Sequence, residues 1–260
     1  MMRAAITSWT VLMSMCLGQV GSAPAMGSPE KLRVSVIRSF PHDPGAYTQG
    51  LLFQAGKIYE STGLVGQSSV RRVVLQSGSV EMKVPLEEPL FGEGLAYVNG
   101  RLYQLTWKDG RAIVWNAASF KRERELRYQG EGWGLCFDGT QLIMSDGTDR
   151  LVRRNPQTFE VTGELRVRSA GVPVNMLNEL ECVGSTIYAN VWQTPYIVRI
   201  DARNGGVTAW IDATGLLSPE EARRAEVLNG IAYMPESSTF IITGKLWPRM
   251  FEVKFVPAAG

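Results

Sequence analysis

The sequence is short of the residues that most metal and nucleophile sites require. It contains one histidine, His42, and three cysteines in 260 residues. A histidine-ligated metal, or a Ser-His or Cys-His relay, would therefore have to use His42 itself. The sequence has no glycine-rich phosphate loop and no D-x-D-x-D-G calcium loop. Any chemistry must then rely on carboxylate, ammonium, amide and indole groups.

Charge of one sign and long apolar runs are also scarce. Lysine and arginine number 27 against 25 aspartates and glutamates, so the net charge is close to zero. A nucleic-acid-binding surface needs a concentrated basic face, and we expect no nucleic-acid partner. Beyond the N-terminus, no stretch is apolar enough to cross a bilayer.

The N-terminus has the composition of an export signal. Arg3 is the only charged residue in the first 25, and a mostly apolar run follows it from residue 4 to 17. Small residues at 21–25 then supply a cleavage site. We expect a signal peptide over residues 1–25 and a single domain over 26–260.

The expected location follows from that signal. The mature protein should be periplasmic or secreted, and away from the membrane after cleavage. The residues before Cys16 match a lipoprotein cleavage box poorly, so a lipid anchor there is not expected.

One sequence pattern occurs five times along the chain. In each repeat a small or polar lead-in precedes an apolar strand pattern, and a short loop and a second strand-like run follow. The anchor positions lie 44, 40, 45 and 51 residues apart: Gly50, Gly94, Gly134, Glu179 and Gly230. A period of about 40–50 residues built from short strands is typical of propeller blades. The pattern predicts an all-β fold, a five-bladed β-propeller with four antiparallel strands per blade.

The two ends of the repeat region complete this interpretation. The fifth repeat stops after three strands, and residues 31–40 alternate polar and apolar residues. We expect this N-terminal strand to pair into the last blade and close the ring. Residues 218–227 are the one helical candidate, with Ser218 as N-cap and Pro219 in the first turn. This insertion accounts for the longest interval.

Two cysteines remain after the signal peptide. Cys136 and Cys182 lie two and three residues after their anchors, which places them on opposite faces of neighbouring blades. A disulfide between these facing surfaces is geometrically conceivable. Two buried thiols that act as small hydrophobic residues fit the pattern equally well.

Equivalent positions in the five repeats define two rings around the central channel. The residues just before the anchors are Gln49, Glu93, Trp133, Asn178 and Asn229. Those at the ends of the second strands are Gly63, Trp107, Gly147, Trp192 and Lys245. The rings combine an aromatic wall with a few polar groups, which is typical of a small-molecule site.

Each of these residues alone would be explained by packing or solvation, and their shared register is what favours a site. Burial would raise the pKa of Glu93 whereas Lys245 would lower it, so the net direction cannot be read from the sequence.

Eight ordered motifs between residues 40 and 255 resemble the plant and bacterial glutaminyl cyclases, or glutamine cyclotransferases. They are H-D-P-G-A-Y-T-Q-G-L, F-G-E-G-L, Y-Q-L-T-W-K, G-E-G-W-G-L, L-N-E-L-E, A-N-V-W-Q-T, V-L-N-G-I-A-Y and I-T-G-K-L-W-P. The resemblance implies a metal-independent five-bladed propeller that needs no cofactor. It also implies the reaction: the N-terminal glutamine of a peptide or protein cyclises to pyroglutamate with release of ammonia.

The resemblance also implies roles for individual residues. Glu93 would be the acid/base residue that holds the substrate α-amine. Other residues would line the pocket: Gln49, Phe91, Trp107, Trp133, Asn178, Trp192 and Lys245. Tyr47 departs from the phenylalanine of papaya-like members and adds a hydroxyl to the pocket rim.

These side chains suit the reaction. A substrate α-amine has an ordinary pKa of about 7.7–8.0 and must lose a proton before it attacks. Glu93 can accept that proton and return it to the departing nitrogen. Lys245 and Asn178 can stabilise the oxyanion, and the indoles can fold the substrate onto its own amine. We expect a monomer, because a closed propeller has no free sheet edge.

Two alternatives from other classes remain at this point. The first is a metal-dependent, lactonase-like propeller hydrolase, with its ligands drawn from Glu93, Asn178, Asp146 and Glu181. Three tryptophans and a lysine fit such a metal site poorly. The second alternative is a non-enzymatic propeller that binds peptides on one face.

Overall fold

The computed structural model describes Met1 and residues 28–258. The expected signal peptide therefore lies outside the described residues, apart from Met1. The regular secondary structure of the described chain is β-strand, apart from a single short helix. Within it, no helix has the length and apolar character needed to span a bilayer.

Three of the repeats form separate four-stranded antiparallel sheets, in which neighbours along the chain pair in order. The first sheet contains β2 (Thr48–Gln54), β3 (Lys57–Thr62), β4 (Ser69–Val73) and β5 (Val80–Pro85). The second contains β6 (Gly92–Val98), β7 (Arg101–Thr106), β8 (Arg111–Asn116) and β9 (Arg122–Arg127). The third contains β10 (Leu135–Phe137), β11 (Leu142–Ser145), β12 (Arg150–Arg154) and β13 (Val161–Arg166).

The last two repeats share one eight-stranded sheet. Its first half is β16 (Leu177–Val183), β17 (Thr186–Val191), β18 (Tyr196–Asp201) and β19 (Val207–Asp212). Its second half is β1 (Glu30–Pro41), β22 (Arg249–Pro257), β21 (Thr239–Gly244) and β20 (Leu228–Met234). β1 pairs antiparallel with β22, and its beginning also pairs in parallel with β19. The sequence did not predict this second pairing, which joins two repeats into one sheet. A small hairpin of β14 (Arg168–Ser169) and β15 (Val172–Pro173) forms a sheet of its own beside β19, where Trp210 Nε1 donates to Ser169 Oγ at 2.9 Å.

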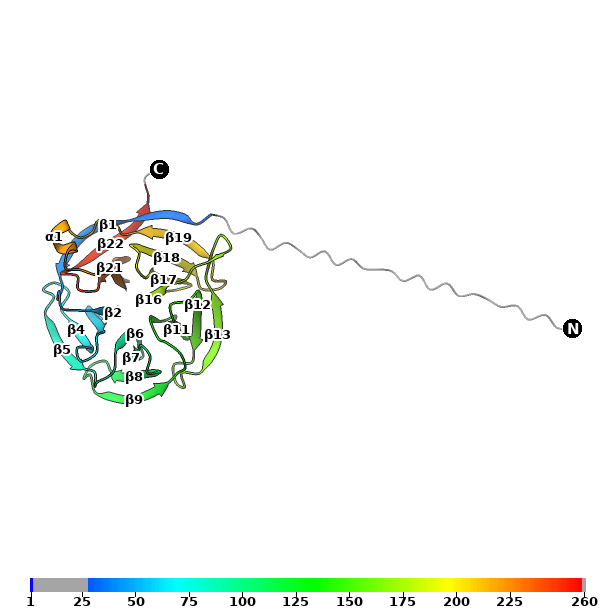
Figure 1. The fold of residues 1–260 in the computed structure, drawn as a ribbon, viewed down its shortest axis with the longest axis horizontal. Helices are drawn as coiled ribbons and strands as arrows, with labels where there is room; N and C mark the ends of the chain where they lie inside the picture. The colour runs from blue at the N-terminus through cyan, green and yellow to red at the C-terminus, as the bar shows by residue number, and fades with distance from the viewer. Residues whose placement is uncertain (2–27, 259–260) are drawn as a thin grey trace.

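The sheets are arranged around a centre, as in a propeller. Figure 1 shows β2, β6 and β16 near the middle, and β5, β9 and β13 on the perimeter. The inner strands approach so closely that the anchor glycine Gly134 has no room for a side chain, since a Cβ there would collide with the carbonyl oxygen of Asn178.

Glu179 stands at the one anchor position that is not glycine. Its side chain is fully buried, and its two carboxylate oxygens accept hydrogen bonds from backbone N–H groups of other repeats. Leu51 in β2 donates at 3.2 Å and Ile231 in β20 donates at 2.8 Å. Glu179 therefore ties three inner strands together at the centre of the ring.

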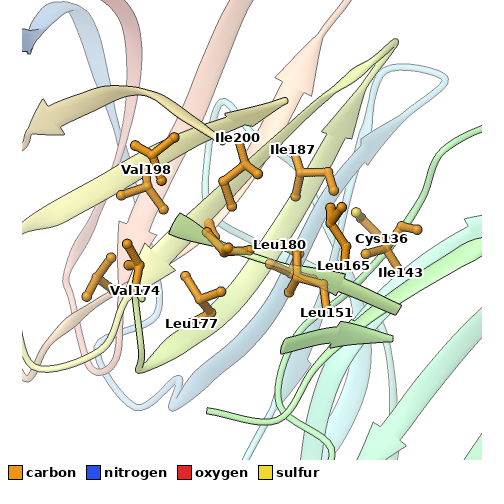
Figure 2. Packing of buried hydrophobic residues seen from close by; sticks show 14 residues of the cluster. Cys136, Ile143, Leu151, Leu165, Val174, Leu177, Leu180, Ile187, Val198 and Ile200 are labelled. Carbon is orange, nitrogen blue, oxygen red and sulfur yellow. The ribbon is translucent and has the colours of Figure 1, made fainter. Parts of the chain in front are cut away.

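The hydrophobic core lies between neighbouring sheets. Figure 2 shows one such cluster, in which Ile143 and Leu151 of the third repeat lie beside Leu180 and Ile187 of the fourth. Cys136 belongs to the same cluster and forms a disulfide with Cys182, with the two Cα atoms 5.5 Å apart. Of the two interpretations of these cysteines, the structure therefore has the bonded one.

The helical insertion is shorter than the predicted range of 218–227. Helix α1 covers only Pro219–Ala222, and Ser218 and Glu221 form the capping box that starts it. The helix ends early because the chain is then held in an extended path beside Lys245. Glu226 N–H donates to the carbonyl of Lys245 at 2.8 Å, and Lys245 N–H donates to that of Val227 at 3.0 Å.

Candidate active site

The polar residues of the first ring are presented by β-bulges. In four repeats the pairing between the inner strand and the next strand shifts register at the anchor, and the skipped residues include Gln49, Glu93, Asn178 and Asn229. An extra residue in one strand re-aims its side chain. In the third repeat, Trp133 lies just before β10. The repeated bulge explains why equivalent positions point toward the same centre.

Members of the second ring follow directly on their strands. Trp107 follows β7, Trp192 follows β17 and Lys245 follows β21. Backbone hydrogen bonds fix these positions against the neighbouring loop: Trp107 N–H donates to the carbonyl of Phe91 at 3.0 Å. The same contact joins Trp192 to Met176 at 2.8 Å.

The structure brings all nine expected site residues into one cavity of about 190 Å³. Its floor is polar and buried, and consists of Gln49, Glu93, Asn178 and Lys245, each no more than 4% exposed. Its rim is aromatic and half-buried, and consists of Tyr47, Phe91, Trp107, Trp133 and Trp192.

Three members of the two rings have other positions. Asn229 does not line the cavity; its amide donates to the side chain of Gln49 at 3.1 Å and to the carbonyl of Thr48 at 3.0 Å. Gly63 and Gly147 leave space for aromatic rings, because a Cβ would collide with Phe91 at the first and approach Trp133 at the second.

Hydrogen bonding on the floor is incomplete. Gln49 donates its amide N–H to Glu93 Oε1 at 2.9 Å, and Asn229 holds Gln49 from behind. The buried Oδ1 of Asn178 has no hydrogen-bond partner. The Nζ of Lys245 lies 4.8 Å from the ring centroid of Tyr47, a cation–π contact. Buried polar groups without partners are costly, and a polar ligand in the cavity would satisfy them.

Two acidic residues beside the cavity were not predicted from the sequence. Glu131 accepts hydrogen bonds from both Trp107 Nε1, at 2.8 Å, and Trp133 Nε1, at 3.0 Å. The charge of Glu226 acts to raise the pKa values of both Tyr47 and Lys245. Glu226 lies in the loop before β20, outside the repeated strand pattern. Glu131 lies three residues before its anchor Gly134, at the position that Tyr47 and Phe91 of the rim occupy in their own repeats, and this shared register was a signal for it.

The electrostatics of the cavity floor show the direction of the pKa shift of Glu93, which the sequence left open. Burial raises the pKa of the Glu93 carboxyl well above its ordinary value, the Lys245 charge lowers it in part, and Glu131 raises it further. Burial also lowers the pKa of Lys245, against the attraction of Glu93 and Glu226. Desolvation therefore dominates at Glu93, and brings its affinity for protons closer to that of an amine.

This arrangement can bind a small polar group under an aromatic rim and move a proton within it. Among the residues that the structure describes, Glu93 is the only carboxylate that lines the cavity. Its lining offers carboxylate, ammonium and amide groups and no imidazole or thiol, a poor donor set for a transition metal. Among residues 28–258, no three histidine, cysteine, aspartate or glutamate side chains gather as a metal site.

Comparison with known proteins agrees with the geometry. The sequence profile of the family described as glutamine cyclotransferase matches residues 10–255. A glutaminyl-peptide cyclotransferase of Arabidopsis thaliana is 39% identical over 231 residues, which are 87% of this chain and 72% of the relative. The crystal structure of Myxococcus xanthus glutaminyl cyclase superposes with a TM-score of 0.81 at 40% identity, over 89% of this chain and all of the other. The chain therefore belongs to the glutamine cyclotransferase family.

Proposed function

We propose that this protein is a glutaminyl-peptide cyclotransferase, which converts the N-terminal glutamine of peptides and proteins to pyroglutamate. The observation that carries the proposal is the shared cavity. A carboxyl group of raised pKa lies on its floor with an amide and an ammonium group, under a rim of aromatic rings. The family and the named relatives support the same activity.

The proposed reaction begins with Glu93 as a base. The carboxylate accepts a proton from the substrate α-ammonium, whose ordinary pKa is about 7.7–8.0. A raised pKa makes Glu93 a better match for this transfer than an ordinary glutamate. The amine nitrogen then attacks the δ-carbon of the glutamine side chain and closes a five-membered ring.

The second half of the reaction expels ammonia. Attack places a negative charge on the former carboxamide oxygen, and Lys245 and the Asn178 amide donate to it. Glu93 returns its proton to the departing nitrogen and takes up the second proton of the new ring nitrogen, the bond from carbon to the departing nitrogen breaks, and the carbonyl reforms. The released ammonia carries this last proton away as ammonium, which leaves Glu93 ionised for the next cycle. Gln49 fixes the carboxylate, and the tryptophans hold the side chain folded toward its own amine. No metal or cofactor takes part in this mechanism.

A lactonase-like metal site is less well supported. It would need Asp146 and Glu181 beside Glu93 and Asn178, but neither acid lines this cavity. Glu181 lines a different one together with Cys182. A non-enzymatic peptide-binding propeller would leave the raised pKa of Glu93 without a use.

We infer five blades of four strands, with β1 completing the last. The β19–β1 pairing is parallel, whereas every ladder within each four-stranded unit is antiparallel. The eight-stranded sheet thus divides naturally at that contact. We also propose that residues 26–260 are one exported, monomeric domain. The disulfide between Cys136 and Cys182 supports an oxidising compartment such as the periplasm or the exterior.

Mass spectrometry of a glutamine-initiated peptide tests the function directly. Incubation with the protein should remove one ammonia from the peptide faster than the spontaneous reaction, and equally fast with a chelator present. A matched peptide that begins with asparagine controls for deamidation elsewhere. A rate equal to that of the peptide alone would refute the proposal.

A further inference from the structure

The aromatic side chains around the cavity are interrupted in one sector, where Lys245 contacts Tyr47 instead of another ring. Ring contacts join Tyr47 to Phe91 with centroids 6.1 Å apart, and Phe91 to Trp107 at 5.6 Å. Glu131 bridges Trp107 to Trp133, which contacts Trp192 at 5.4 Å. Among the rings of residues 28–258, no such contact closes the circle from Trp192 back to Tyr47.

An apolar groove of about 370 Å³ adjoins the rim in this sector, between Trp192 and Tyr47. Leu216, Leu217 and Ala225, all from the segment around α1, pack on a core cluster that includes Trp247. Trp247 donates its indole N–H to the carbonyl of Glu226 at 2.8 Å, which fixes the segment against the sheet.

The groove and the cavity have no lining residue in common, but their linings are adjacent at two places. Trp192 lines the cavity, and the next residue, Gln193, lines the groove. On the other side, Lys245 lines the cavity while its backbone pairs with Glu226 and Val227, which line the groove. α1 lies at the edge of the ring beside the start of β22 (Figure 1), where Glu221 accepts from Arg249 Nε at 2.5 Å.

We propose that this groove is the subsite for the residue that follows the N-terminal glutamine of the substrate, and that it selects an apolar side chain there. The inference rests on the proposed function, because the first cavity then holds the glutamine and the peptide chain must leave through the rim. The gap between Trp192 and Tyr47 is the sector without an aromatic barrier. Glu226 beside this gap adds a charge that disfavours an acidic second residue.

The proposal gives a function to residues 213–227, which connect β19 to β20 and contain the insertion predicted at 218–227. This segment makes the last repeat interval the longest, and its apolar residues line the groove rather than the cavity. The leucines that it adds remain half-buried rather than sealed in the core. Burying a substrate side chain against them would strengthen binding in proportion to the apolar area covered.

Kinetics on a matched substrate series tests the subsite. The series is glutamine amide, which has no second residue, and three short peptides with leucine, glycine or glutamate after the glutamine. For each protein, kcat/KM for every peptide is divided by that for glutamine amide, so that damage to the first cavity cancels. In the wild type we expect leucine to exceed glycine by about tenfold and glutamate to be poorest.

The variant Leu217→Lys should weaken the preference for leucine and exchange the ranks of the glycine and glutamate peptides. The half-exposed side chain can extend its ammonium toward solvent, so the fold should be kept while the groove gains a positive charge. We expect the preference for leucine to fall at least threefold and the glutamate peptide to rise above the glycine peptide. Val65→Lys is the matched control, since it puts the same charge on an exposed residue near Gly63, away from the groove.

The outcomes separate the two proposals. An unchanged second-residue profile in Leu217→Lys, with normal turnover of glutamine amide by the wild type, would overturn the subsite alone. An equal change in Val65→Lys would also overturn it, because the effect would then be a general one of charge. Absence of turnover of glutamine amide by the wild type would overturn the proposed function, and the subsite with it.

Discussion

Glu60 and Glu93 are both buried glutamates in neighbouring repeats, yet their surroundings differ completely. Glu60 accepts hydrogen bonds from Thr48 at 2.6 Å, His42 at 3.0 Å and Arg71 at 2.8 Å. Glu93 accepts one, from the neutral amide of Gln49. Burial favours the neutral acid at both sites, but at Glu60 the Arg71 guanidinium and His42 outweigh burial and hold the pKa well below its ordinary value.

The difference shows how one residue type becomes structural or reactive. A carboxylate surrounded by cations and hydroxyls has no reason to take a proton near neutral pH, and it stabilises the fold only while its partners remain. A carboxyl group with unfilled hydrogen-bonding capacity in a cavity can exchange a proton with a ligand. His42, the single histidine of the chain, belongs to the structural site of Glu60. One of its ring nitrogens contacts Glu60 and the other contacts the carbonyl of Trp247 at 2.7 Å.

The largest expected effect is on catalysis, through Glu93→Gln. Glutamine keeps the size of the side chain and one acceptor but cannot take up the amine proton, so the rate of ammonia release should fall about 10²–10⁴-fold. Glu123→Gln, an exposed acid on the outer strand β9, is the control. A near-normal rate in the Glu93→Gln variant would show that Glu93 is not the acid/base residue.

The same variant should have a distinct effect on stability. The pKa of Glu93 is raised in the folded state, so the contribution of this group is fully present below the unfolded pKa. That contribution is lost as pH rises through the raised value. Glu93→Gln should therefore have a higher melting temperature than the wild type at alkaline pH, with the gap closing toward acidic pH.

Glu60→Gln should have the opposite signature. Removing the charge leaves Arg71, buried at 2% exposure, with the more exposed Asp43 as its remaining charged partner, and breaking a buried pair costs about 3–5 kcal/mol. Urea unfolding should show this loss at neutral pH. The lost stability is present above the unfolded pKa and disappears as pH falls, since the pKa is lowered in the fold. The folded Glu60→Gln variant, assayed at low temperature, should retain the kcat of the wild type. A large fall in kcat would contradict the contrast between Glu60 and Glu93.

Removing a group that stabilises the oxyanion comes next in size. Asn178→Ala and Lys245→Ala should each lower kcat about 10²–10³-fold, with smaller changes in KM. Trp192→Ala should act mainly on KM, because its indole positions the substrate. Steady-state kinetics on one peptide separates the two patterns. Equal changes in kcat for all three variants would mean that the floor and rim do not have separate roles.

The sequence was sufficient to predict the residues that repeat and insufficient for those that do not. The positions of Gln49, Glu93 and Asn178 in the site could be predicted by counting residues from the anchor of each repeat, because these three repeats have a bulge at the same place. The extent of α1 did not follow, since capping signals locate a helix start better than its end, and here contacts of Glu226 with Lys245 end it. The parallel pairing of β1 with β19 depends on strands far apart in the sequence.

The direction of the pKa shift of Glu93 could not be predicted from the sequence either. Burial and the Lys245 charge oppose each other, and only their geometry decides which one dominates. Glu131 was missed for a related reason. Its function depends on two indoles from different loops that reach one carboxylate oxygen.

The smallest predicted effect concerns this acid, through Glu131→Gln. A glutamine oxygen can still accept from both indoles, so kcat should change less than about tenfold. The negative charge that helps to raise the pKa of Glu93 is lost, however, and the carboxylate form becomes easier to reach. Activity requires Glu93 ionised to accept the amine proton, so it falls as pH drops through that pKa. In Glu131→Gln the acidic limb of kcat should therefore move to lower pH, while Glu123→Gln leaves it in place. A shift to higher pH, or an equal shift in both variants, would show that Glu131 does not act on Glu93 through its charge.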